Sequence, residues 1–140
     1  LWPGYCSTHA QIDPDAIKKL KQQNPDAVVL AHPECNFEVW EYADEMLSTG
    51  QMLEFVDKNP AEKFIIVTEI GIVHTMKKQN PDKEFVPVSQ KAVCPNMKKI
   101  NLEKILWALE NDDYKIELSE QIITRARTAL DRMIEVLPGK

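Results

Sequence analysis

Apolar and polar positions along residues 13–88 fall into blocks, each with the length of one strand or one helix. Short runs dominated by branched apolar residues, at 27–31 and 63–68, are typical of strands that are buried on both faces. The stretches between them carry apolar residues at helical spacing and close at Asn-Pro pairs. Alternating strands and helices favour parallel pairing, so the pattern predicts an α/β fold with a parallel sheet between two helical layers, a Rossmann-like three-layer α/β/α domain.

The boundaries of the elements follow from capping residues and helix breakers. Asp13-Pro14 is a favourable helix start, because the Asp side chain accepts free amide hydrogens and proline loses no hydrogen bond there. The expected helices lie at 14–23, from 36 through 43, from 48 or 49 to the Asn59-Pro60 pair, at 71–79, from 102 after the cap Asn101, and from 120 after the cap Ser119 to the Pro138-Gly139 pair. The expected strands are 27–31, 63–68, 84–88 and 114–118, and residues 89–99 form an irregular loop.

Side chains able to do chemistry follow the expected strands. His32 and Glu34 come after the first strand, Glu69 comes after the second, and Cys94 lies beyond the third. The carboxyl ends of parallel strands meet at one edge of the sheet, where the ligands of such folds gather. We therefore expect these residues at one rim, and Cys6 joins them if a further strand precedes it.

Three cysteines are too few, and odd in number, for a disulfide framework. Thiolate is the preferred ligand of iron-sulfur clusters and of zinc. Proline or glycine stands close to Cys6 and Cys94, which suits loops whose backbone wraps tightly around a metal group. By residue type alone, Cys35 completes a site of three thiolates; the alternative is that it starts a helix and packs as a small hydrophobic residue.

The overall charge favours a small molecule as the ligand. The 140 residues include 17 basic and 22 acidic side chains, a formal net charge of −5, which argues against a nucleic acid or an anionic membrane surface as partner. With 44% hydrophobic residues, the chain is able to bury a real core. It has no apolar run of the roughly 18 residues that a membrane span needs and no charged leader, so we expect a cytoplasmic protein.

Six motifs run through nearly the whole chain: WPGYCSTH, HPECNFEV, AD followed by ST, VTEIGI, NPDKEFVP and CPNMKKINLEKILWALE. In this order they resemble the C-terminal half of quinolinate synthase, the iron-sulfur enzyme of NAD biosynthesis. The last motif is the most specific, whereas HPE or ST alone means little. Met46-Leu47 stands where a glycine is usual in the family, and Ile100-Asn101 where a threonine cap is usual, and neither departure touches a proposed ligand or proton-transfer residue.

The resemblance implies a truncated form of a three-domain fold. Residues 1–12 then end a preceding domain and carry one cluster-ligand loop, and residues 13–93 form a complete α/β domain. Residues 94–140 hold a second ligand loop and a helix-strand-helix segment that packs on a missing N-terminal domain. Because the chain begins at Leu1 inside a motif, without an initiator methionine, we expect the N-terminal half to be absent and the fragment to be inactive alone.

The resemblance also implies a cofactor. In the family, three cysteines, one from each of three similar domains, hold a [4Fe-4S] cluster whose fourth iron stays open as a Lewis acid. Cys6 and Cys94 match two of these ligands, and the third lies outside this chain, so Cys35 is expected to be a bystander. The implied reaction condenses iminoaspartate with dihydroxyacetone phosphate to quinolinate, with loss of phosphate and water. It links the protein to the aspartate-oxidising enzyme that supplies iminoaspartate.

The same resemblance assigns proton transfer and substrate binding. Glu34 is expected to be a base near the open iron, with His9 and His32 as proton donors or substrate anchors. Without the motifs, a solvated loop residue and a strand-end histidine bonded to backbone are the simpler interpretations of His9 and His32. Ser48 and Thr49 are expected to hold substrate anions at a helix start, a role that is compatible with simple helix capping.

Two other polar residues have weaker assignments. Glu69 is a second-tier candidate, because a carboxylate at a strand end is often solvated or paired with a lysine such as Lys98. His74 pairs with none of the motifs and is assigned to a helix surface.

A second interpretation of the chain is a binding module without catalysis. In it the cysteines are structural or bind zinc, and the strand-end residues bind some other small anion. Structural zinc sites draw on closely spaced pairs of ligands. Cys6 and His9 form one such pair, but no second pair follows in the sequence. The two hypotheses are therefore a fragment of a [4Fe-4S] synthase and a zinc- or small-anion-binding α/β module.

Overall fold

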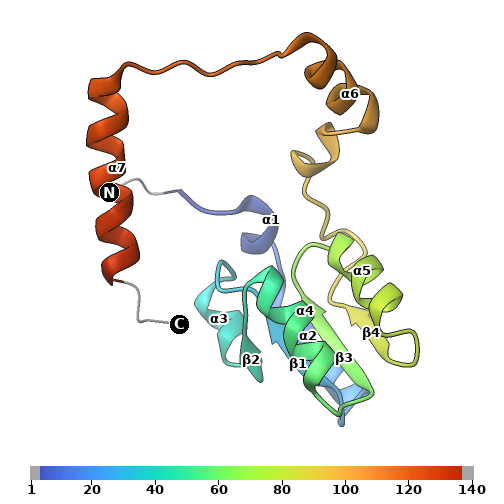
Figure 1. The fold of residues 1–140 in the computed structure, drawn as a ribbon. Helices are drawn as coiled ribbons and strands as arrows, with labels where there is room; N and C mark the ends of the chain where they lie inside the picture. The colour runs from blue at the N-terminus through green and yellow to red at the C-terminus, as the bar shows by residue number, and fades with distance from the viewer. Residues whose placement is uncertain (1–3, 137–140) are drawn as a thin grey trace. The chain divides into compact units, whose positions relative to one another are not determined.

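A computed structural model describes residues 4–136 of the chain (Figure 1). Its helices are α1 (Ser7–Ala10), α2 (Pro14–Gln23), α3 (Phe37–Trp40), α4 (Thr49–Lys58), α5 (Gly71–Gln79), α6 (Leu102–Asn111) and α7 (Glu120–Val136). Its strands are β1 (Val28–Ala31), β2 (Glu45–Met46), β3 (Lys63–Val67) and β4 (Glu84–Pro87), and one 3₁₀ turn, η1 (Met97–Lys99), follows them. The chain divides into two compact units, of which the first ends at Lys98 and the second begins at Lys99.

The first unit is built on one parallel sheet of four strands with the order β2-β1-β3-β4. The register pairs Ala31 with Val67, the last residues of β1 and β3. The His32 N–H donates to the Val67 oxygen at 3.2 Å, so the ladder extends one residue past both strands. The residues that follow the two central strands therefore leave the sheet at the same edge.

Alternate residues of each strand face opposite helical layers. The face that carries Val29 and Ile65 packs against α2 and α3. The opposite face, which carries Leu30 and Phe64, packs against α4 and α5. Both faces of the sheet are buried, as the apolar strand runs predicted, and the three-layer α/β/α fold is confirmed.

The helix starts predicted at Asp13-Pro14 and at Asn101 are confirmed by their caps, whereas Asn36 starts α3 without a side-chain capping bond. The Asp13 carboxylate accepts the Asp15 N–H at 3.0 Å, and Pro14 takes the first helical position of α2. In the second unit, the Asn101 side chain accepts the Lys104 N–H at 2.9 Å and begins α6. Each cap satisfies a backbone donor that has no partner within its helix.

The predicted strand at 114–118 is wrong. No strand forms over these residues, and Tyr114 and Ile116 are each 83% exposed. Alternating apolar and polar positions stabilise a strand only where a neighbouring strand takes up its hydrogen bonds, and the described part of the second unit offers none. The predicted end of the last helix, at Pro138-Gly139, lies outside the described residues.

Two short elements were not predicted, α1 and β2. The helix has four residues and the strand has two, and neither is long enough to carry a recognisable apolar period. The strand forms because Leu30 and Ala31 of β1 offer it a partner, with Leu30 opposite Glu45. Tertiary pairing, and not local propensity, therefore makes β2.

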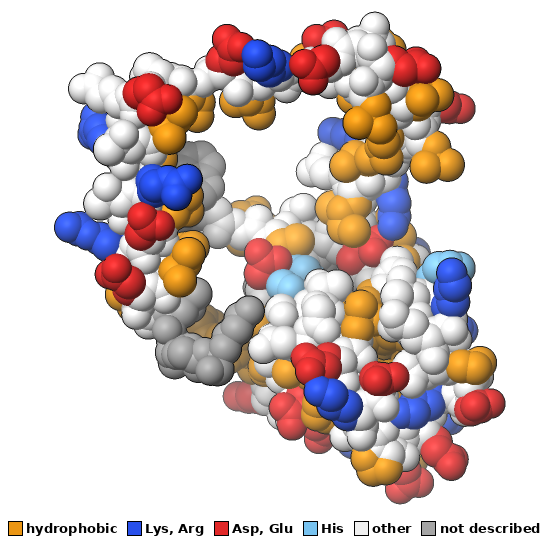
Figure 2. Space-filling view, viewed as in Figure 1, with side chains coloured by type: hydrophobic (Ala, Val, Ile, Leu, Met, Phe, Trp, Pro, Cys, Tyr) orange, Lys and Arg blue, Asp and Glu red, His pale blue; other side chains and the backbone are white. Residues whose placement is uncertain are grey.

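The second unit consists mainly of α6 and α7, and its apolar side chains are exposed; Figure 2 shows them in orange along both helices. The exposed large apolar residues of the unit are Ile100, Leu102, Ile105, Leu106, Trp107, Leu109, Tyr114, Ile116, Leu118, Ile122, Ile123, Leu130, Met133, Ile134 and Val136. Among the described helices, none has the length and apolar character needed to cross a membrane. Packing of this segment on an N-terminal domain stays a prediction.

Replacing Phe64 tests the assignment of the core. Its side chain is fully buried against Phe85, with ring centroids 5.8 Å apart, so we expect Phe64→Ala to lower the free energy of unfolding by about 3–5 kcal/mol. The matched control is Phe37→Ala, because Phe37 is 76% exposed and keeps only a ring contact with Trp40, worth about 1 kcal/mol. Urea unfolding measures both. Equal losses in the two variants would contradict the burial described here.

Candidate functional site

The short helix α1 carries the Cys6 loop onto the end of the sheet. Cys6 directly precedes the helix, and Thr8 and His9 within it are buried. The His9 Nε2 lies 2.8 Å from the hydroxyl of Thr68, the residue that follows β3. This buried hydrogen bond spans 59 positions of sequence, so it fixes the Cys6 loop to the carboxyl end of a central strand.

His9, His32 and Glu34 form one contact group. The His9 Nδ1 lies 3.2 Å from the Glu34 Oε2. The two imidazole rings stack with centroids 4.4 Å apart and planes 1° from parallel. A carboxylate only accepts hydrogen bonds, so the neutral His9 ring donates its Nδ1–H to Glu34 and accepts the Thr68 hydroxyl at Nε2. The three residues with proposed roles in proton transfer thus touch one another.

The environment of His32 keeps its ring uncharged. Burial lowers the pKa of His32 below its usual value, the neighbouring His9 lowers it further, and the Glu34 carboxylate partly offsets both. The His32 Nδ1 accepts the backbone N–H of Glu34 at 3.2 Å, which leaves Nε2 as the protonated nitrogen. His32 is therefore a neutral donor at Nε2, and its bond to backbone is the simpler role that the sequence also offered.

Cys6, His9 and Glu34 direct three kinds of metal ligand to one point. The Cys6 Sγ, a ring nitrogen of His9 and a carboxylate oxygen of Glu34 all lie within 4.8 Å of one another. Thiolate, imidazole and carboxylate are ligands of zinc and of iron. To bind a metal at Nδ1, His9 takes the other tautomer, in which its Nε2–H donates to the Thr68 hydroxyl, the kind of second bond that most metal-binding histidines make. The group has the donor chemistry to hold a metal.

Cys94 reaches the same end of the first unit through Thr8. The Thr8 hydroxyl lies near the Cys94 sulfur, and Thr8 is two residues from Cys6. The backbone N–H of Met97 lowers the pKa of Cys94 most strongly, and the Asn96 N–H and the Thr8 hydroxyl lower it further. Burial and the negative charge of Glu69 oppose them. The net effect favours the thiolate, which is the form that binds metals.

Cys35 has the opposite environment. It is 4% exposed, and its Sγ–H donates to the Val67 oxygen at 3.6 Å. Burial is the main cause that raises the pKa of the Cys35 thiol to about 11. At neutral pH Cys35 is therefore a protonated thiol within the core face that also holds Val39, which agrees with the packing role considered from the sequence.

Ser48 and Thr49 lie at the start of α4, and both are exposed. The Gln51 Oε1 accepts hydrogen bonds from the Ser48 N–H at 2.9 Å and from the Ser48 hydroxyl at 2.8 Å, so Ser48 caps the helix. The preceding Leu47 N–H donates to the oxygen of Ala31 at 2.9 Å. This bond keeps the start of α4 beside the end of β1, at the edge where His32 also lies.

Glu69 pairs with Lys98, as the sequence suggested. The Lys98 Nζ lies 3.0 Å from the Glu69 Oε1. His74 is exposed on α5, as predicted.

Sequence reasoning missed Thr8 and Thr68. The Thr8 hydroxyl lies near the Cys94 sulfur, and the Thr68 hydroxyl bonds the His9 ring of the Cys6 loop. The available signal was a hydroxyl residue within two positions of a candidate ligand, as in the STH of the first motif.

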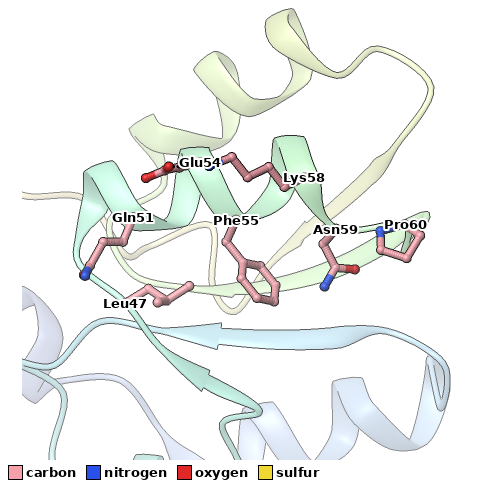
Figure 3. Close-up of a pocket in the computed structure, with 7 residues that line it drawn as sticks. All are labelled: Leu47, Gln51, Glu54, Phe55, Lys58, Asn59 and Pro60. Carbon is pink, nitrogen blue, oxygen red and sulfur yellow. Dashed lines mark hydrogen bonds and ion pairs between the residues drawn. The ribbon is translucent and has the colours of Figure 1, made fainter. Parts of the chain in front are cut away.

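Two of the hollows in the first unit lie near proposed site residues. One, of about 750 Å³, lies between residues 7–16 and residues 88–95 and therefore adjoins both Thr8 and the Cys94 loop. The other, of about 430 Å³, runs along α4; Figure 3 shows the Phe55 ring pointing from the helix into it. The lining of this second hollow is Leu47, Gln51, Glu54, Phe55, Lys58, Asn59 and Pro60, which includes no thiol and no imidazole. The larger hollow is thus the one next to the candidate ligands.

Comparison with known proteins decides the family. A sequence model of the family described as Quinolinate synthetase A protein matches residues 1–135. The chain is 49% identical over 135 residues to a quinolinate synthase of Geotalea uraniireducens. It is 44% identical over 136 residues to one of Caldicellulosiruptor saccharolyticus and 44% identical over 135 residues to one of Methanosarcina barkeri. The chain belongs to the quinolinate synthase family.

The matches to these quinolinate synthases cover 96% to 97% of this chain but only 44% to 45% of each relative. The chain therefore spans less than half the length of the relatives that it matches. The resemblance inferred from the six motifs is confirmed at the level of the family. What the complete enzymes do comes to this chain as a proposal.

Alkylation distinguishes the three thiols of this chain. Because Cys35 is buried and its pKa is raised to about 11, we expect iodoacetamide at pH 7.5 to modify Cys6 and Cys94 in the metal-free protein and to spare Cys35. Peptide mass spectrometry reads the modified positions, and denatured protein, in which all three react, is the control. Modification of Cys35 at the rate of Cys94 in the folded protein would contradict its assigned environment.

Histidine titration tests the stacked pair. Since the pKa of His32 is lowered by burial and by His9, we expect its NMR signals to titrate below the ordinary value of about 6.5. The variant His9→Asn removes the neighbouring ring, so the pKa of His32 should rise toward the ordinary value. A His32 pKa above the ordinary value of about 6.5 would refute the described environment.

Proposed function

We propose that this chain supplies part of the active site of a quinolinate synthase. The proposed reaction condenses iminoaspartate with dihydroxyacetone phosphate to quinolinate, with release of phosphate and water, in de novo NAD biosynthesis. The observation that carries the proposal is the convergence of Cys6, His9 and Glu34 within 4.8 Å of one another, with Thr8 of the same loop near Cys94, in a chain whose relatives bear this name.

The proposed cofactor is a [4Fe-4S] cluster, and the donor set of the chain fits it. Cys6 and Cys94 are partly exposed thiols, and the Thr8 hydroxyl of the Cys6 loop lies near the Cys94 sulfur. The third cysteine is proposed to come from the part of the enzyme that this chain does not include. When bound, a cluster with an open iron supplies a Lewis acid for a substrate carboxylate or hydroxyl.

Cys35 is proposed to take no part in binding this cluster. A thiol whose pKa is raised to about 11 must lose its proton before it binds iron, and burial opposes that loss. Its Sγ–H bond to the Val67 oxygen would also be given up. The environment of Cys35 thus supports the bystander role.

The proposed proton-transfer residues have complementary environments. The Glu34 side chain is 57% exposed, so its carboxylate is accessible to a substrate, and the hydrogen bond from His9 orients it as a base. The neutral His32 donates from Nε2 and serves as an acid or as an anchor for a substrate oxygen. Its stacking on His9 keeps both rings in place.

Ser48 and Thr49 are proposed to bind an anionic group of a substrate. They are exposed at the start of α4, a helix of ten residues, where free backbone N–H groups and the helix dipole favour negative charge. The hydrogen bonds from Ser48 to the Gln51 side chain order the first turn of this helix. Capping and anion binding are compatible at this position.

The proposed partners are the two small substrates and, as a source of iminoaspartate, the aspartate-oxidising enzyme. A reducing cytoplasm is the proposed location, since free thiols are the form that binds a cluster and Cys6, Cys35 and Cys94 are all free. The chain by itself is proposed to be inactive, because one cluster ligand and further substrate contacts lie elsewhere in the enzyme.

A zinc-binding module is the second candidate function, favoured by one observation. Cys6, His9 and Glu34 by themselves make a three-ligand site with the donor types of zinc. In this alternative Cys94 is not a ligand. The two candidates therefore differ in their dependence on Cys94.

Anaerobic reconstitution of the full-length protein with iron and sulfide tests the proposal. We expect a broad visible absorbance and roughly four iron and four sulfide per polypeptide. Cys6→Ser and Cys94→Ser should each abolish cluster and quinolinate formation, whereas Cys35→Ser should retain both. Loss of the cluster in Cys35→Ser would overturn the ligand assignment. Uptake of one zinc that survives Cys94→Ser, with no cluster absorbance in the wild type, would favour the second candidate.

A further inference from the structure

Glu69 is a nearly buried carboxylate to which the proposed function gives no role. It follows Thr68 at the end of β3, and its side chain is 9% exposed. Its Oε2 accepts the backbone N–H of Gly71 at 2.7 Å. The carboxylate is thus fixed at the turn between β3 and α5, beside the residues of the rim.

Lys98, in the Cys94 loop, balances the negative charge of Glu69. The Lys98 Nζ, in the turn η1, lies 3.0 Å from the Oε1, which is enclosed by protein and has no well-aligned hydrogen bond among the described residues. Burial raises the pKa of Glu69, but Lys98 and the backbone N–H groups of Gly71 and Cys94 outweigh it, so the net pKa is lowered. The group is therefore an anion that depends on one cation.

A side chain at position 71 would crowd this pair. A Cβ added to Gly71 would lie 2.6 Å from the Glu69 Oε2 and 3.2 Å from the Lys98 Nζ. Contacts this short force the carboxylate or the ammonium to move. Gly71 therefore provides the space in which the two charged groups meet.

Among the described residues, backbone bonds tie the Cys94 loop to the end of β3 at and before Cys94, and the ion pair adds a contact after it. Before Cys94, the Ile70 N–H donates to the Ala92 oxygen at 2.8 Å and ties the segment to the end of β3. After Cys94, the backbone contact is a long one within the loop itself, from the Lys98 N–H to the Cys94 oxygen at 3.4 Å. The bond from Lys98 to Glu69 is the connection from this second side back to the sheet.

We propose that Glu69 is a positioning residue that, through Lys98, holds the Cys94 loop in the conformation in which its thiolate binds the cluster. Residues 94–98 carry the Met97 and Asn96 N–H groups that face the Cys94 sulfur. When the contact between Lys98 and Glu69 is lost, the loop turns these N–H donors away from the Cys94 sulfur. Cys94 then leaves the position at the rim in which it binds the cluster. The inference rests on the proposed function only in taking Cys94 as a ligand.

The test uses three variants of the full-length protein: Glu69→Gln, Lys98→Met and Gly71→Ala. Each should speed amide hydrogen exchange of residues 94–99 in the metal-free protein roughly tenfold, while exchange of β3 stays as in the wild type. Each should also weaken iron retention against a chelator, by roughly 10- to 100-fold, the usual effect of losing a group that orients a metal ligand.

Two further variants separate positioning from general stability. Lys98→Arg keeps the charge beside Glu69 and should restore slow exchange of residues 94–99 and most of the iron retention. Lys63→Met is the matched control and should change neither measurement, since Lys63, at the start of β3, pairs at 2.7 Å with Glu84 of the neighbouring β4.

The outcomes are distinct. If residues 94–99 exchange their amide hydrogens at the wild-type rate in all three variants, the inference is wrong. It is also wrong if exchange in β3 speeds up as much as in residues 94–99, because that would indicate general destabilisation. Faster exchange of the loop with unchanged iron retention would support the anchor and reject Cys94 as a cluster ligand, so that the proposed function fails separately. Faster exchange with weaker retention supports both.

Discussion

The buried hydrogen bond between His9 and Thr68 is the contact on which the candidate site depends. The helix that carries His9 has only four residues, so its own backbone bonds do little to hold it in place. The bond joins it to β3, whose register with β1 in turn sets the position of His32. Through these two links, a loop at the start of the chain comes to lie on the carboxyl end of a sheet formed much later in the sequence.

The fold gives its three cysteines different chemistry. Cys35 lies under the helices of one sheet face, where burial favours the neutral thiol. Cys94 lies in a loop whose N–H groups and a threonine hydroxyl surround the sulfur, so the thiolate is favoured. Residue type alone treats the cysteines as equal candidates, and only the backbone around each sulfur separates them.

Much of the fold followed from sequence because its signals are local. The runs at 27–31 and 63–68 are apolar on both faces, and the caps Asp13 and Asn101 mark helix starts that the structure confirms. The strand expected at 114–118 has the right alternation but no partner to pair with, and β2 exists only because β1 offers one. Pairing between distant segments is the information that a single sequence does not carry.

The candidate site shows the same division between local and distant information. Strand-end topology predicted that His32, Glu34 and Glu69 would share a rim, because parallel strands end at one edge. The contacts of Thr8 with Cys94 and of His9 with Thr68 needed the folded chain, since each joins segments far apart in sequence. The ion pair of Glu69 with Lys98 was foreseen as one outcome among several, and its burial was not.

Anomalous X-ray diffraction at the iron edge, from crystals of the anaerobically reconstituted full-length protein, tests the central claim most directly. The account predicts an iron peak within about 2.3 Å of the sulfurs of both Cys6 and Cys94, a usual metal–thiolate distance, and none beside Cys35. A metal peak bound by Cys6, His9 and Glu34 with Cys94 turned away would contradict it.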